Sequence, residues 1–180
     1  MNNNEPLLLT SEYALLGFLA EGSSHGYELH KKLIDPAGFG MIWGIKIANM
    51  YAQLEKLARK GYIVGKVQVN DQRPARTEYT LTVEGKAEFD RWLTQLVEHP
   101  RDFRHEFMAR VYFLLRFQPE ALHELIDRQL ATSEGWLSAI SQKETSHSIP
   151  GSFEHLTYHF RVSQIQSMVE WLRWLKNQLQ

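Results

Sequence analysis

Apolar side chains recur every three or four residues through the first third of the chain, a spacing that predicts amphipathic helices. The expected helices cover about residues 10–21, 23–34 and 45–60. A serine or threonine can cap each of the first two, and Asp35-Pro36 ends the second because the residue before proline avoids the helical conformation. The side chains expected to face the core are Ala14, Leu15, Phe18, Leu19, Tyr27, Leu29, Leu33, Phe39, Ile42, Trp43, Ile47, Met50, Leu54 and Leu57.

The pattern changes to alternation after Gly61, which suits the left-handed position that follows a helix. Residues 62–69 and 77–81 favour strands, and the sequence Asn-Asp-Gln-Arg-Pro between them has the chemistry of a turn. This predicts a β-hairpin. Thr82 can then cap a fourth helix that runs to about Glu98.

The second half is expected to be helical throughout, with helices over residues 103–117, from Pro119 to about residue 145, and from Ser152 to about Gln180. The last helix is roughly 40 Å long at 1.5 Å per residue and has a broad apolar surface. Such a surface needs a partner. A compact bundle within one chain would cover it, but we favour pairing with a second copy.

Together these elements predict a mainly α fold with a small β-hairpin. Residues 1–98 are expected to form an N-terminal winged helix-turn-helix that binds DNA, and residues 99–180 a C-terminal long-helix dimerisation domain. The distribution of charge along the chain supports DNA binding by the first of these domains. Net charge is −1 over 180 residues, but residues 44–76 hold seven basic and two acidic side chains. A local excess of this kind is typical of a specific DNA-binding surface, although a solvated helix with a charged hairpin would look the same.

The polar face of the third helix carries Lys46, Asn49, Gln53 and Lys56. Asparagine and glutamine can pair bidentately with adenine, and lysine can bind guanine or phosphate. We expect Lys46, Asn49 and Gln53 to read bases and Lys56 to bind phosphate. An ordinary amphipathic helix would have the same polar side, so the preceding helices and the following hairpin are what favour DNA. Arg73 and Arg76 at the hairpin tip are expected to anchor the wing on DNA.

Other chemistry is absent from the sequence. No cysteine is present, which excludes disulfides and thiolate metal sites. No catalytic motif and no phosphate-binding glycine loop are found, so neither an enzyme nor a cofactor is predicted. His155 and His159 have metal-ligand spacing, but no third ligand follows, and no metal site is predicted. No signal peptide and no apolar run of about 20 residues are present, so we expect a cytoplasmic protein without a membrane partner.

The first half, from about Leu9 to Leu93, resembles the PadR-type transcriptional regulators. The matching residues are Ala14-Leu15-Leu16-Gly17, His25-Gly26-Tyr27-Glu28-Leu29, Met50-Tyr51 with Leu54, Leu57, Gly61, Tyr62 and Ile63, and Arg73-Pro74 through Tyr79, Leu81, Thr82 and Gly85. The second half looks like the helical C-terminal domain of the family's long form, including its quorum-regulated virulence activator. The chain departs from the family at Lys46–Asn49, where a Ser-Pro-Gly-Thr-like segment is usual, so no operator sequence can be carried over.

The resemblance implies a homodimer held by C-terminal helices and bound to double-stranded DNA at an inverted-repeat operator. Many members are repressors and a few activate; we expect a repressor. It also implies release by an aromatic or multidrug-like small molecule, for which Trp136, Trp171 and Trp174 are candidate contacts, although tryptophans at helical spacing often only pack. Resemblance favours a phosphate contact for Tyr51. The alternative function is a winged-helix protein-interaction adaptor that does not bind DNA.

Overall fold

The computed structural model describes residues 8–42, 44–70, 73–147 and 149–179. They form two compact units. The first contains the residues up to Gln95 together with Arg104–Phe113, and the second contains Leu96–Phe103 together with Leu114–Gln180. Near the predicted boundary at residue 98, two short segments therefore alternate between the units. Residues 96–103 belong to the second unit, and residues 104–113 return to the first. The roles predicted for residues 1–98 and 99–180 stay predictions.

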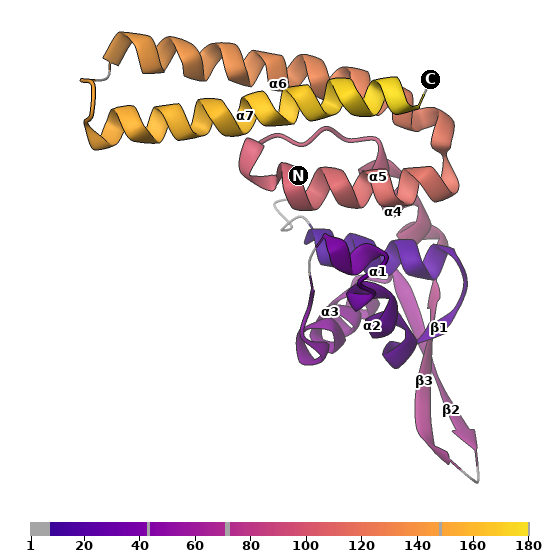
Figure 1. The fold of residues 1–180 in the computed structure, drawn as a ribbon. Helices are drawn as coiled ribbons and strands as arrows, with labels where there is room; N and C mark the ends of the chain where they lie inside the picture. The colour runs from indigo at the N-terminus through magenta and orange to yellow at the C-terminus, as the bar shows by residue number, and fades with distance from the viewer. Residues whose placement is uncertain (1–7, 43, 71–72, 148, 180) are drawn as a thin grey trace, which may run out of the picture. The chain divides into compact units, whose positions relative to one another are not determined.

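Three helices open the first unit (Figure 1): α1 (Thr10–Ala20), α2 (Gly26–Ile34) and α3 (Ile47–Arg59). A 3-10 turn, η1 (Phe39–Met41), lies between α2 and α3. The second helix begins later than predicted because Ser24 and His25 form a two-residue strand, β1, and His25 rather than a serine is the N-cap. A strand this short leaves no periodicity in the sequence to detect.

The predicted core face of these helices is largely confirmed. Leu29, Leu33, Met50, Leu54 and Leu57 are buried. Two assignments are wrong, because Tyr27 is 59% exposed and Ile47 is 44% exposed. Both residues lie in the first turn of a helix. Helical side chains point back toward the N-terminus of their helix. Side chains of a first turn therefore extend beyond the core surface against which the rest of the helix packs. Trp43 lies outside the described residues.

The predicted hairpin is confirmed as β2 (Ile63–Asn70) and β3 (Arg73–Leu81), which with β1 form an antiparallel sheet in the order β1-β3-β2. Gly61 has φ +75°, the left-handed conformation expected after α3. Register runs from Ile63 opposite Leu81 toward the tip, and the hairpin extends away from the three helices of its unit (Figure 1). Residues 71–72 of the predicted turn lie outside the described residues.

An aromatic core joins the helices of the first unit. Thr82 caps α4 (Val83–Leu93) by accepting from the Gly85 N–H at 3.0 Å, as predicted, but α4 ends at Leu93 rather than near Glu98. Phe89 of α4 meets Phe113 edge-to-face at 5.3 Å between ring centroids. Phe113 is contributed by α5 (Met108–Phe117), and its ring lies where a Cβ on Gly17 would be, so α5 packs closely on α1.

The second unit is an antiparallel helical hairpin of α6 (Pro119–His147) and α7 (Phe153–Gln178), side by side in Figure 1. Ser152 caps α7 as predicted, accepting from the His155 N–H at 3.2 Å. The single helix predicted over residues 103–117 is instead a π-helical turn, η3 (Phe103–Phe107), followed by α5, and a 3-10 turn, η2 (Pro100–Asp102), precedes it. Among the described residues, no helix combines the length and apolar character needed to cross a bilayer.

Within the second unit, one face of α7 is buried and another carries exposed apolar side chains, so the choice between a compact bundle and a dimer stays a prediction. Phe153, Leu156, Phe160 and Trp174 are 86%, 58%, 61% and 55% exposed. At about 100° per residue, these four side chains fall within roughly 60° of the helix circumference. Their stripe lies on a different face from Ile165, Val169 and Leu172, which are buried. We call these four residues the α7 stripe.

Candidate nucleic-acid interface

The start of α3 presents two free polar side chains. Lys46 is the N-cap residue of α3, Asn49 lies in its first turn, and both are exposed. Neither side chain has a hydrogen-bond or ion-pair partner among the described residues. Their donors and acceptors are therefore open to a ligand that approaches α3 from solvent.

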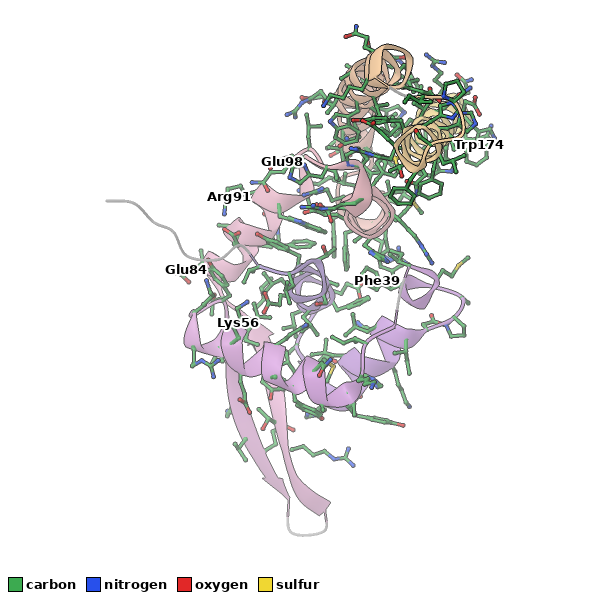
Figure 2. All side chains as sticks on the ribbon, turned by 90° about the vertical axis from the view of Figure 1, so that its left-hand side faces the viewer. Phe39, Lys56, Glu84, Arg91, Glu98 and Trp174 are labelled. Atoms are coloured by element: carbon green, nitrogen blue, oxygen red, sulfur yellow. The ribbon has the colours of Figure 1, made fainter. Side chains whose placement is uncertain are left out.

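The next two predicted contacts on α3 are less accessible. Gln53 is half-buried, and its Oε1 is buried without a hydrogen-bond partner in the described part of the chain. The Nζ of Lys56 lies 2.7 and 2.8 Å from the two carboxylate oxygens of Glu12, whose side chain is 1% exposed; Figure 2 labels Lys56 on α3. Glu12 also accepts from the Leu9 N–H at 2.7 Å. Lys56 thus neutralises a buried carboxylate at the start of α1, which supports a structural role for it rather than a phosphate contact.

Tyr51 is a residue of α3, and its ring lies against Gly26 at the start of α2. Its side chain is 40% exposed, and a Cβ added to Gly26 would lie 2.6 Å from its Cε1 atom. Only glycine leaves room for the ring in this position. Tyr27 is exposed beside it on α2, with the Lys31 ammonium 4.6 Å from its ring centroid. The assignment of Tyr27 to the core kept Tyr27 and the neighbouring Lys31 out of the predicted interface, although the place of Tyr27 in a first turn was a usable signal.

A cleft of about 480 Å³ separates the helices from the wing. Its lining residues are His25, Gly26, Tyr27, Glu28, Tyr51, Arg76, Thr77 and Tyr79. His25 links the start of α2 to β3 of the wing, because its Nδ1 donates to the Thr77 carbonyl oxygen at 3.2 Å. Burial raises the pKa of Tyr79, and nearby Tyr51 and Glu55 add to the effect, so the phenol stays a proton donor.

One acidic group lies in the same cleft. Glu28 accepts from the His25 N–H and the Ser24 hydroxyl, at 3.4 and 3.2 Å, and these hydrogen bonds lower its pKa. The carboxylate therefore remains ionised and satisfies the start of α2. An anion in this cleft would therefore bind more favourably beside Arg76 and the tyrosine hydroxyls than beside the Glu28 carboxylate at the start of α2.

The wing carries exposed basic side chains on both strands of the hairpin. Arg76 is exposed and lies opposite Gln68 in the hairpin register. Arg73 begins β3, but its side chain lies outside the described residues. Lys66 is a further exposed cation on β2, and it was not singled out from the sequence.

The three candidate effector tryptophans have different surroundings in the second unit. Trp136 lines a cleft of about 200 Å³ beside α7. Trp171 packs edge-to-face on Phe103, with 6.0 Å between ring centroids. Trp174 belongs to the exposed α7 stripe and is labelled in Figure 2. As for metals, no group of three potential ligands comes together within the described residues.

Sequence comparison gives independent information. Residues 15–91 match the model of the Transcriptional regulator PadR-like family, and residues 103–180 match that of the Virulence activator alpha C-term. The chain is 26% identical over 170 residues to the Negative transcriptional regulator PadR of Bacillus subtilis (strain 168), covering 89% of this chain and 92% of that protein.

Solved structures of similar proteins include two complexes of Bacillus subtilis PadR. The one with operator DNA is 24% identical with a TM-score of 0.48, covering 96% of this chain and 100% of that chain. The one with p-coumaric acid is 25% identical with a TM-score of 0.42, covering 94% and 95%. The family assignment rests on the sequence matches, which are to regulators rather than enzymes. The sequence matches support a PadR-type transcriptional regulator, in which a PadR-like domain is followed by a C-terminal region of the virulence activator alpha type.

Proposed function

We propose that this protein is a homodimeric repressor that binds an inverted-repeat operator. In each subunit α3 enters the major groove, and Lys46 and Asn49 read base edges. The observation that carries the proposal is that these two side chains are exposed and unpartnered at the start of α3, beside the projecting wing. Gln53 contributes only if its half-buried amide turns outward on binding.

Backbone contacts hold the register of the protein on DNA. Arg76 and Arg73 bind phosphates along the wing. The hydroxyl of Tyr51 donates to a phosphate at the mouth of the cleft, and the exposed Tyr27 and Lys31 extend the same surface along α2. Lys56 is left out of this set because it pairs with Glu12.

The α7 stripe supports dimerisation. Four large apolar side chains on one face of a helix are poorly hydrated, and a second copy covers them by symmetry. A twofold dimer also explains an operator with two inverted half-sites. The two α3 helices are then expected roughly 34 Å apart, one turn of B-DNA. We further propose that a small aromatic molecule releases the dimer from its operator.

The direct test is fluorescence anisotropy with a labelled DNA fragment from upstream of the gene that encodes this chain. Binding should be tighter than to a random fragment of equal length, and log K should fall linearly with log salt concentration. The number of phosphates neutralised follows from the slope. Failure to bind either fragment at low salt would favour the adaptor alternative.

A further inference from the structure

The side chain of His25 continues the sheet where its shortest strand stops. Strand β1 pairs with β3, and His25 lies opposite Glu78 in this register. The next position would pair Gly26 with Thr77, but α2 begins at Gly26 and β1 ends before it. The His25 ring supplies a donor in place of the strand, because its Nδ1 lies 3.2 Å from the Thr77 carbonyl oxygen. This hydrogen bond extends the attachment of the wing by one position beyond β1.

The same hydrogen bond fixes the chemistry of the other ring nitrogen. A carbonyl oxygen can only accept, so Nδ1 carries the hydrogen, and Nε2 of the neutral ring has a free lone pair. Nε2 has no hydrogen-bond partner among the described residues. Protonation of Nε2 therefore adds a positive charge and a second N–H donor without breaking the link to Thr77.

This charge develops in the cleft at whose mouth the Tyr51 hydroxyl is proposed to bind phosphate. His25 lines the cleft together with Tyr51, Arg76 and Tyr79. Arg76 directly precedes Thr77 on β3, so the hydrogen bond to Thr77 also holds the backbone that carries the Arg76 guanidinium. A guanidinium, two phenol hydroxyls and an imidazole that can gain charge thus share one concave surface, and each can donate to a phosphate oxygen.

Two acids lie next to His25, and both already accept hydrogen bonds. Glu28 accepts from the His25 N–H and the Ser24 hydroxyl, which lower its pKa, so it stays ionised throughout the range in which histidine titrates. Glu78 accepts from Gln68 at 2.8 Å. The other charged or titratable groups around the cleft are Tyr27 on α2, Tyr51 on α3, and Arg76 and Tyr79 on β3.

We propose that His25 is a phosphate-binding residue of the DNA interface and that it binds as the imidazolium. Nδ1 holds the wing through Thr77, and the protonated Nε2 donates to a phosphate oxygen beside Arg76 and Tyr51. A bound phosphate favours the charged ring, so binding takes up a proton. Because histidine changes charge between about pH 5 and 8, affinity for DNA rises as pH falls through this range. The inference rests on the DNA-binding function proposed above.

His25→Asn separates the charge from the link to the wing. The asparagine amide can take the place of Nδ1, so it keeps a donor for Thr77 and remains a good N-cap, but it cannot gain a charge. Anisotropy is measured with the upstream and the random fragment at about pH 5.5 and about pH 8, at constant ionic strength. Wild type should bind roughly tenfold more tightly at the lower pH. His25→Asn should lose most of this gain and match wild type within about twofold at the higher pH.

His30→Asn is the matched control. His30 also lies on α2, and its Nε2 also bonds a backbone carbonyl, that of Ile45 at 3.1 Å, but it does not line the cleft. This variant should keep the pH dependence of wild type. Calorimetry at about pH 6.5, in two buffers of different ionisation enthalpy, detects the proton directly. Wild type and His30→Asn should take up protons on binding DNA, and His25→Asn should not.

An equal pH dependence in wild type and His25→Asn, or its loss in His30→Asn instead, would overturn the proposal and leave the repressor function standing. Thermal unfolding checks that His25→Asn is folded, and His25→Gln is the second uncharged variant if it is not. Proton uptake that depends on His25 but is equal for both fragments would support the phosphate contact and refute an operator-specific function. Absence of binding to either fragment at both pH values would refute both.

Discussion

At the scale of single residues, the candidate interface is defined by which polar groups already have partners. Lys46 and Lys56 are equally basic in the sequence, yet Lys46 is exposed while Lys56 is bound to a buried carboxylate. Asn49 and Gln53 differ in burial instead, since Asn49 is exposed whereas Gln53 is half-buried and its Oε1 has no partner among the described residues. A free donor costs little to bring to DNA, whereas a paired one must first break a contact.

Asn49→Ala tests the assignment of base reading. The substitution removes an amide able to pair with one base, and it should cost about 1–3 kcal/mol at a single base pair of the operator. Anisotropy measured on a panel of operators with single base changes detects this loss as relaxed preference at that position. An unchanged ratio of operator to random-DNA affinity would show that Asn49 does not read bases.

Arg76→Ala is the matched comparison for a phosphate contact. It should weaken binding to operator and random DNA to the same extent, and it should reduce the salt slope by about 1. Selective loss of operator binding in this variant would instead mean that the wing reads sequence.

Glu28 carries a pH dependence with a defined sign. Its folded pKa lies below its ordinary value of 4.5, so its hydrogen bonds stabilise the fold fully above that pH and progressively less as pH falls through the folded pKa. Between pH 7 and pH 3, thermal unfolding of the wild type should therefore shift further downward than that of Glu28→Gln. Parallel pH profiles of Tm for the two proteins would contradict this.

At the scale of elements, a buried arginine joins α5 to α4. The side chain of Arg110 is 2% exposed; its Nε donates to the Trp92 carbonyl oxygen at 3.0 Å, and its guanidinium lies 4.9 Å from the Trp92 ring centroid. A terminal nitrogen lies 2.9 Å from Glu106, while desolvation lowers the Arg110 pKa. The first half of α5 is therefore held in the first unit by polar contacts as well as by Phe113.

Arg110→Ala should lower the free energy of unfolding by about 3 kcal/mol, the low end of the range for breaking a buried ion pair, because Glu106 keeps some exposure to water. Urea denaturation measures the loss. Arg104→Ala, an exposed arginine of the same segment, is the control and should change stability by less than about 0.5 kcal/mol. Similar midpoints for both variants would show that the Arg110 contacts contribute little.

At the scale of the whole molecule, the exposed α7 stripe predicts the oligomeric state. Phe160→Glu places a charge in the middle of the stripe and should convert a dimer to a monomer in sedimentation velocity, with loss of operator affinity. Asn177→Glu adds the same charge to an exposed polar position of α7 and should leave the dimer intact. A Phe160→Glu protein that remains dimeric would mean that another surface pairs the subunits.

The sequence alone determined the winged-helix outline, because its signals are local. Period-3.6 and alternating patterns, the caps at Thr82 and Ser152 and the left-handed Gly61 each act within a few residues, and each agrees with the structure. Tertiary structure alone decided which polar residues are free. The pairing of Lys56 with Glu12, the contact of Tyr51 with Gly26 and the exposure of Tyr27 depend on residues distant in the chain or on the end of a packed surface. The cleft that Trp136 lines likewise needs residues from three segments brought together, which no local pattern encodes.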